Sequence, residues 1–143
     1  MNTEQPTRIV IAEDSRIQAK MLIKRLESTG YEVRWGANGQ EALDFIQNDP
    51  PDLIISDIEM PEMNGYQLCQ AVKQDQTLRR IPLILLSTLS SPEDIIEGLQ
   101  AGADNYVTKP YEAEYLLSRV DSLLHSTIQD LSLIHISEPT RPY

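Results

Sequence analysis

The chain has 143 residues and a formal net charge of −10, with 41% hydrophobic and 24% charged residues. That length suits one globular domain, and the composition is not that of a disordered chain. Acidic chains repel phosphate backbones and anionic lipids, so we expect no direct nucleic-acid binding and no membrane docking. The lone Cys69 excludes an internal disulfide, and neither a signal peptide nor a bilayer-spanning apolar run is recognised, so we expect a cytoplasmic location.

Short apolar runs alternate with helical patterns along the chain. The strand-like runs are Ile9–Ala12, Val33–Ala37, Leu53–Ser56, Leu83–Leu86 and Tyr106–Val107. The third and fourth runs are almost continuously apolar, which is typical of strands buried on both faces. Because strand and helix alternate five times, the pattern predicts an α/β fold with a doubly wound, five-stranded parallel sheet.

The predicted helices carry start signals and apolar faces. Capping arrangements stand at Asn38 with Glu41, at Asn64 with Gln67, and at Ser91 with Pro92 and Asp94. Apolar residues at helical spacing form one face of three helices, namely Ala19, Leu22, Ile23 and Leu26, then Leu68, Cys69 and Val72, then Ile95, Ile96 and Leu99. Gly30 is expected to end the first helix. The last pattern begins near Glu112 and continues through Leu117, Val120, Leu124 and Ile128.

Polar side chains follow the predicted strands at one edge of the sheet. Glu13 and Asp14 come after the first strand, Asp57 ends the third, and Lys109 follows the fifth. In such open sheets, ligands bind beyond the carboxyl ends of the strands. Carboxylates packed together repel one another unless a cation bridges them, and hard oxygen ligands without His or Cys favour Mg²⁺. The sequence therefore predicts a Mg²⁺ site held by Glu13, Asp14 and Asp57.

These residue types in this arrangement favour phosphoryl transfer. Lys109 offers a point positive charge, and Ser87, at the end of the fourth strand, offers a hydroxyl donor to phosphoryl oxygens. Asp57 is then the expected nucleophile, which forms an aspartyl phosphate. Metal and lysine neutralise the charge of the transferring group, which is most of what this reaction requires.

Four motifs resemble the receiver domain of bacterial response regulators over about residues 8–126. They read VIAEDS, LIISDIEMPEMNG, IPLILLST and GADNYVTKP. The resemblance implies a flavodoxin-like receiver fold with sheet order 2-1-3-4-5. It also implies that the backbone carbonyl of Glu59 is a further Mg²⁺ ligand, that Ser87 and Lys109 contact the phosphoryl group, and that Lys109–Pro110 is a cis peptide. Tyr106 would turn inward when Ser87 moves toward that group.

The resemblance implies a two-component phosphorelay as the setting. The partners would be a histidine kinase or phosphotransfer protein and then an output domain or target protein. The domain itself would be a phosphoprotein and a switch, not an enzyme, although it would hydrolyse its own aspartyl phosphate. Ile17 and Met21, one turn apart on the first helix, are candidates for the kinase-docking surface.

Three positions depart from the commonest pattern of the family or vary within it. Ser87 stands where Thr is commoner, and Thr88 where a small residue is usual, which is expected to tighten access to the site. Glu59 stands two residues after Asp57, where family members vary. Our hypothesis is that Glu59 repels or misorients attacking water and so lengthens the life of the aspartyl phosphate.

Other functions stay open on the residues alone. A haloacid-dehalogenase-like phosphatase also uses an Asp nucleophile with a second acid two residues later, which Asp57 and Glu59 superficially match. A flavin-binding domain is disfavoured, because the loop after the first strand is acidic rather than rich in Gly, Ser and Thr. A phosphorylation-independent interaction module is the third alternative.

The final residues require a separate interpretation. Leu131–Arg141 reads LSLIHISEPTR, which resembles the translation of a transposase adapter used to build sequencing libraries. We therefore expect a tail at residues 1–7, a receiver domain at 8–126, a helix end or connector at 127–130, and an artefact at 131–143 that gives His135 no function. On this interpretation the gene is cut near Asp130, and the natural protein is either a single-domain receiver or a longer chain, such as a larger regulator or a hybrid kinase.

Overall fold

The computed structural model describes residues 6–133, with side chains described for residues 6–125. Predictions that concern residues 134–143, including His135, and the side chain of Ile128 lie outside the described residues. Within the described range the chain forms one sheet of five parallel strands in the order β2-β1-β3-β4-β5, as predicted. Its strands are β1 Arg8–Ala12, β2 Glu32–Gly36, β3 Leu53–Asp57, β4 Leu83–Ser87 and β5 Asn105–Thr108.

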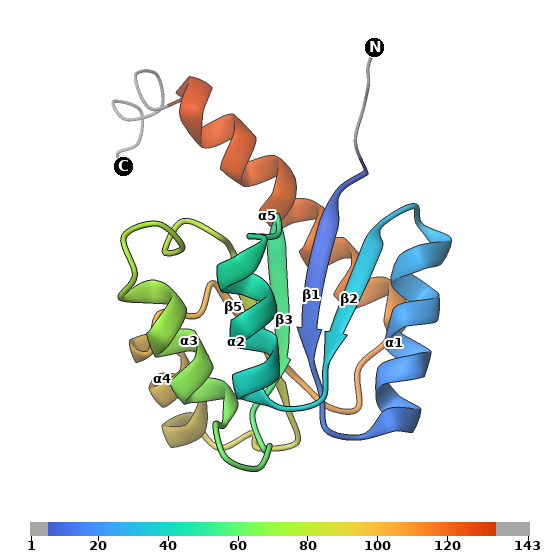
Figure 1. The fold of residues 1–143 in the computed structure, drawn as a ribbon, viewed down its shortest axis with the longest axis vertical. Helices are drawn as coiled ribbons and strands as arrows, with labels where there is room; N and C mark the ends of the chain where they lie inside the picture. Colours follow the sequence, from blue (N-terminus) through green and yellow to red (C-terminus); the bar gives the residue numbers. More distant parts are fainter. Residues whose placement is uncertain (1–5, 134–143) are drawn as a thin grey trace.

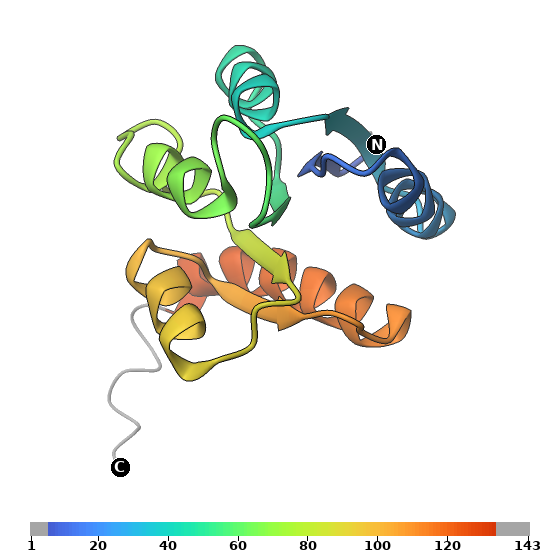
Figure 2. The ribbon, with the colours of Figure 1, turned by 90° about the horizontal axis from the view of Figure 1, so that it is seen from below.

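The helices alternate with these strands and lie on both faces of the sheet (Figures 1 and 2). Their bounds are α1 Arg16–Ser28, α2 Gly39–Asn48, α3 Gly65–Lys73, α4 Pro92–Gln100 and α5 Ala113–Leu133. The long α5 runs past the sheet in Figure 1. No helix in the described range is long and apolar enough to cross a membrane.

Helix caps fix where most of these helices begin. The side chains of Asn38, Asn64 and Ser91 each accept a hydrogen bond from a backbone N–H in the first turn of the following helix, as predicted. Ser15, which the sequence analysis did not single out, caps α1 in the same way. At the far end of α1, Gly30 has a φ of 99°, the left-handed conformation expected just beyond a helix.

Two predictions about element boundaries and faces are corrected. The second strand ends at Gly36 rather than Ala37, because the Ala37 N–H donates to the Glu41 carboxylate at the start of α2. In α4, all of whose residues are described, Gly98 alone is buried, while Ile96 and Leu99 are half exposed. The apolar face of α4 therefore does not pack fully onto the sheet.

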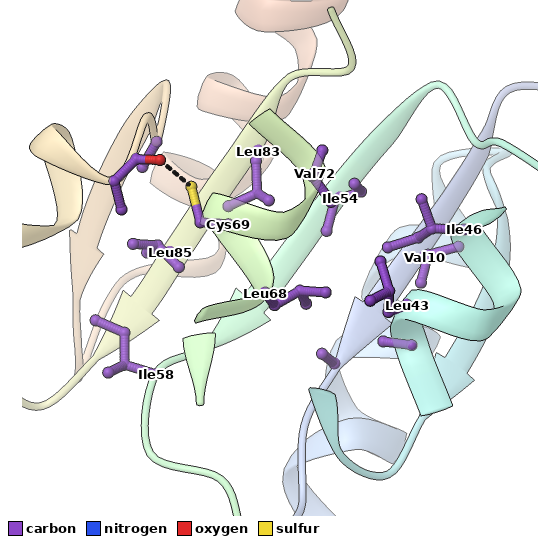
Figure 3. Packing of buried hydrophobic residues seen from close by; sticks show 14 of the residues in the cluster. Val10, Leu43, Ile46, Ile54, Ile58, Leu68, Cys69, Val72, Leu83 and Leu85 are labelled. Atoms are coloured by element: carbon purple, nitrogen blue, oxygen red, sulfur yellow. Dashed lines mark hydrogen bonds between the residues drawn. The ribbon is translucent and has the colours of Figure 1, made fainter. Parts of the chain in front are cut away.

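Side chains that alternate along the strands build a core on each face of the sheet. Val10, Ile54, Leu83 and Leu85 pack with residues of α2 and α3, as Figure 3 shows at close range. The opposite face packs against α1 and α5, through Ile9, Ile11, Leu53, Ile55, Ile84 and Leu86. Each fully buried Leu or Ile contributes about 1.5–3 kcal/mol, so the two cores hold the strand ends in fixed positions.

Cys69 belongs to the first of these cores. Its side chain is fully buried, and its Sγ donates to the carbonyl of Ala101 at 3.4 Å (Figure 3). Burial raises the pKa of the thiol to about 11. Cys69 is therefore a packing residue, as the apolar face of its helix predicted.

Candidate functional site

The predicted site residues gather at the carboxyl ends of the parallel strands, the edge that Figure 2 faces. Glu13 follows β1, and its backbone N–H donates to the carbonyl of Gly36 at the end of β2. The indole Nε1 of Trp35 donates to the carbonyl of Glu13 at 2.8 Å. These two bonds tie the start of the β1–α1 loop to β2 and thereby place the Glu13 side chain.

Three carboxylates meet at this edge. Glu13 and Asp57 are buried, with exposures of 3% and 9%, and Asp14 is exposed. One carboxylate oxygen from each lies within 4.8 Å of the other two. The Ser15 N–H donates to Glu13 Oε2 at 3.1 Å, and the Ile58 N–H donates to Asp57 Oδ1 at 2.9 Å. The backbone thus orients both buried carboxylates.

Lys109 extends its ammonium group between these acids. Its Nζ lies 3.4 Å from Glu13 Oε1 and 3.5 Å from Asp57 Oδ1. The Lys109 N–H donates to the carbonyl of Ser87 at 2.7 Å, which fixes the start of the β5–α5 loop against the end of β4. The peptide bond between Lys109 and Pro110 is cis, as the family resemblance implied.

Burial makes the charged state of the two inner carboxylates unfavourable. It raises the pKa of Glu13, and the nearby Asp57 adds to this effect, while the Ser15 N–H and Lys109 oppose it. Burial likewise raises the pKa of Asp57, against the lowering effect of Lys109 and of the Ile58 N–H. One lysine therefore does not fully compensate two buried acids, and the site favours additional positive charge.

The donor set fits a hard divalent cation. Three carboxylates supply only oxygen ligands, the kind that Mg²⁺ prefers, and they lie close enough together to share one ion. Asp14 faces solvent, so the ligand positions are open to water and to phosphate oxygens. Glu59 follows with an exposed side chain, and the role of its backbone carbonyl as a ligand stays a prediction.

Gly65 makes the geometry around Asp57 possible. A Cβ at this position would lie 2.3 Å from the carbonyl oxygen of Asp57 and 2.8 Å from the Cα of Ile58. The N–H of Gly65 donates to the carbonyl of Ile58, so the first turn of α3 packs directly on the end of β3. No side chain fits there, because the backbones themselves are in contact.

Ser87 and Tyr106 both form a hydrogen bond with the backbone of Leu89. The buried Ser87 Oγ accepts from the Leu89 N–H at 2.9 Å, and the Tyr106 hydroxyl donates to the Leu89 carbonyl at 2.7 Å. The tyrosine ring is partly buried against Gly98 of α4. The structure therefore links the two residues predicted to act as a switch, with the serine hydroxyl engaged by the β4–α4 loop.

A pocket of about 450 Å³ opens beside the acids, between α1 and the β5–α5 loop. Gln18, Met21, Lys109 and Tyr111 contribute to its lining, as does the exposed Thr88. Thr88 thus lines the pocket beside the site, and its effect on access to the site stays a prediction.

Comparison with known proteins assigns the family. The model of the response regulator receiver domain matches residues 9–121. The chain belongs to the response regulator receiver domain family. In that family the carboxyl edge of the sheet accepts a phosphoryl group, and the acidic cluster fits the accompanying Mg²⁺. The phosphatase and the phosphorylation-independent module are accordingly disfavoured.

Individual receivers resemble this chain over most of its length. The response regulator MprA of Mycolicibacterium vanbaalenii is 36% identical over 87% of the chain, and the response regulator PleD of Caulobacter vibrioides is 37% identical over 81%. The chain spans only 53% and 26% of these two relatives.

Among solved structures, the receiver domain of a signal transduction histidine kinase from Syntrophus aciditrophicus is 42% identical. It matches with a TM-score of 0.80, and 96% of each chain is covered. The chemotaxis response regulator CheY4 of Vibrio cholerae is 34% identical with a TM-score of 0.78, over 83% of this chain and 99% of that one.

Two contacts at the site were not predicted from the sequence. The Trp35 indole holds the backbone of Glu13, a role that its place in a strand did not indicate. Gln18, which the sequence analysis did not mention, accepts a hydrogen bond from Lys109 Nζ at 2.8 Å. Gln18 lies in the first turn of α1, three residues after its cap Ser15, and its closeness in sequence to Glu13 and Asp14 is the signal that would have placed it near the site.

Proposed function

We propose that Asp57 of this receiver domain accepts a phosphoryl group from a phosphohistidine donor, with Glu13, Asp14 and Lys109 as its partners. One observation carries this assignment. Asp57 is a buried carboxylate at a strand end, within reach of two further carboxylates and of a lysine ammonium group. A buried nucleophile with uncompensated negative charge around it is suited to act beside a bound cation.

The transfer is a displacement at phosphorus. An Asp57 carboxylate oxygen forms a bond to phosphorus, and the bond between phosphorus and the donor's imidazole nitrogen breaks. The electron pair of that bond stays on the nitrogen, which takes up a proton from solvent. Lys109 faces an oxygen of the phosphoryl group as it arrives. Bound Mg²⁺, held by Glu13, Asp14, Asp57 and the Glu59 carbonyl, would neutralise the charge of the phosphoryl oxygens.

Ser87 and Tyr106 are assigned to the response. A phosphoryl oxygen on Asp57 offers the Ser87 hydroxyl an acceptor, which draws it away from the Leu89 N–H. Because the Tyr106 hydroxyl donates a hydrogen bond to the carbonyl of the same Leu89, a shift of the β4–α4 loop changes the position of the tyrosine ring against α4. Phosphorylation would thereby favour an altered surface over α4 and β5.

The partners follow from the family. We infer a histidine kinase or phosphotransfer protein as the donor and an output domain or target protein as the recipient of the signal, in the cytoplasm. The relatives MprA and PleD are response regulators about twice and four times as long as the region they share with this chain, and their further parts say nothing of the output here.

Labelling with a small phosphodonor tests the assignment. Acetyl phosphate with Mg²⁺ is expected to label the wild-type chain at one carboxylate, and both Asp57→Asn and removal of Mg²⁺ by chelation should abolish the label. Asp75→Asn is a matched control, because Asp75 lies in the loop after α3 and should not change the label. Equal labelling of the wild type and of Asp57→Asn would refute the proposal. Steady turnover of phosphate esters would favour a phosphatase.

Ser87→Ala and Tyr106→Phe test the switch separately. Both variants should still be labelled, but the chemical shifts of α4 amides should respond less to phosphorylation than in the wild type. An unchanged response in both would contradict the assigned coupling while leaving the acceptor assignment intact.

A further inference from the structure

Three polar side chains surround the Lys109 ammonium group, and they come from three different elements. A lysine ammonium group has three N–H donors. Within the described residues, its Nζ donates to Gln18 Oε1 at 2.8 Å and to Glu13 Oε1 at 3.4 Å, and it forms an ion pair with Asp57 Oδ1 at 3.5 Å. The shortest of the three contacts is thus to a neutral amide on α1, not to either carboxylate.

The Gln18 contact differs from the other two in what happens during phosphoryl transfer. Glu13 and Asp57 are the residues to which a cation and the phosphoryl group are assigned, so their contacts with Lys109 change as the site fills. Gln18 lies outside that set, on the exposed side of α1. Its bond to the lysine can persist while the other two donors turn toward a phosphoryl oxygen.

The space around Lys109 has room for other conformations of its side chain. The pocket of about 450 Å³ beside the site is lined by Lys109 and Gln18 together, and it extends along α1 toward Met21 and Arg25. A lysine side chain with four rotatable bonds gains alternative rotamers in such a space if nothing tethers it. The Gln18 amide stands where it keeps the ammonium group over the acids.

We propose that Gln18 is a positioning residue that holds the Lys109 ammonium group at the phosphoryl site. The proposal rests on the function assigned to Asp57 and adds a residue of α1 to it. Removal of the amide acceptor should leave the acids and the fold intact, while Lys109 spends less time in the productive position. The expected consequence is slower phosphoryl transfer, by about three- to tenfold, because a pre-oriented group is lost.

Gln18→Met tests this, because methionine keeps the length and the helix propensity but removes the acceptor. The rate of Asp57 labelling by acetyl phosphate at saturating Mg²⁺ should fall by about three- to tenfold. Gln47→Met is the matched control, since Gln47 is an exposed glutamine of α2, and it should label at the wild-type rate. Urea unfolding should be the same for all three chains.

A second measurement reports on Lys109 without phosphorylation or metal. In ¹⁵N spectra of lysine side chains, assigned with Lys109→Ala, the Lys109 ammonium protons should exchange with water several-fold faster in Gln18→Met than in the wild type. In the Lys109→Ala background, Gln18→Met should change the labelling rate by less than about twofold, because the two residues act through one contact.

Three results would overturn the proposal. They are a wild-type labelling rate in Gln18→Met, a slower rate with unchanged Lys109 exchange, and an equal slowing in the Lys109→Ala background. Failure of the function itself is recognised differently, because the wild type and Asp57→Asn would then label alike whatever Gln18 does.

Discussion

Two acids are buried side by side at the carboxyl edge of the sheet, and this arrangement has a cost when the metal is absent. Burial raises the pKa of both Glu13 and Asp57. Between the ordinary carboxyl pKa, about 4, and these raised values, the folded chain binds more protons than the unfolded chain. The metal-free protein therefore loses stability as the pH rises through that window.

Asp57→Asn should make the metal-free protein more stable at pH 7, by about 1–2 kcal/mol, because the change removes one buried charge. Since both chains are neutral at this position in acid, the difference should shrink as the pH falls toward 4. Urea unfolding in a chelating buffer, repeated at several pH values, measures both effects. Saturating Mg²⁺ should narrow the difference at pH 7, because only the wild type keeps the full ligand set. If the metal-free wild type were more stable than Asp57→Asn at pH 7, burial of the Asp57 charge would not be destabilising and the prediction would be wrong.

Glu59 is the residue through which we expect the lifetime of the aspartyl phosphate to be set. Its side chain is exposed two residues beyond Asp57, and our hypothesis is that it repels or misorients the attacking water. A charge about 4 Å away in a water-like medium is worth about 1 kcal/mol, so Glu59→Ala should speed hydrolysis by roughly fivefold. The decay of labelled protein after removal of the phosphodonor measures this rate.

Glu59→Gln separates the two physical reasons for that effect. If charge repels the water, the glutamine variant should decay as fast as the alanine variant. If the bulk of the side chain misorients the water, glutamine should decay as slowly as the wild type. Unchanged decay in both variants would show that Glu59 does not set the lifetime of the aspartyl phosphate.

At the scale of elements, α4 contains a glycine that helix propensity disfavours and that packing requires. Gly98 lies inside the helix, where alanine is normally about 1 kcal/mol better. A Cβ there, however, would lie 2.7 Å from Cδ2 of Tyr106 and 3.1 Å from Cδ1 of Leu85. The glycine lets the tyrosine ring lie against the helix, and so α4 is positioned by the switch residue.

Gly98→Ala should therefore destabilise the protein by about 1–3 kcal/mol, as overpacking does, instead of stabilising it. In a Tyr106→Ala background most of this loss should disappear, because the ring is the nearest obstacle. Chemical unfolding of the two single variants and the double variant gives the coupling between the sites. Equal losses in both backgrounds would show that the tyrosine does not impose the glycine.

The features that could be predicted from the sequence are those that depend on residues close together in the chain. Asn38, Asn64 and Ser91 cap helices as predicted, because a cap depends on residues within one turn. The exposure of Ile96 and Leu99 was not predictable, since their spacing is helical and only the position of α4 over Tyr106 leaves them in solvent. The bond from Lys109 to Gln18 joins residues 91 apart in sequence, and spacing carries no information about such a pair.

For the molecule as a whole, the two cores on the faces of the sheet fix the site at its carboxyl edge. The surface beside this edge is available to partners. Ile17 and Met21 are 73% and 58% exposed on α1, and Met21 lines the pocket beside Lys109. Two exposed apolar side chains on one helix prove little alone. On the proposed function a phosphodonor must approach the carboxyl edge of the sheet, so their place next to this edge makes them candidates for docking a kinase.

The double variant Ile17→Glu with Met21→Glu places a charge at both positions. It should slow phosphotransfer from a cognate kinase at least tenfold, because a charge buried at an interface commonly costs about 1.4 kcal/mol or more, which is about a factor of ten in affinity. Labelling by acetyl phosphate should stay near the wild-type rate, because a small donor needs no docking surface. Ile96→Glu with Leu99→Glu is the matched control, as it charges two apolar residues of similar exposure on α4. If the α1 variant slows both donors alike, it acts on the site, and docking through this face is refuted. If the α4 variant slows kinase transfer equally, the effect comes from added negative charge on an already acidic molecule, and α1 has no special role in recognition.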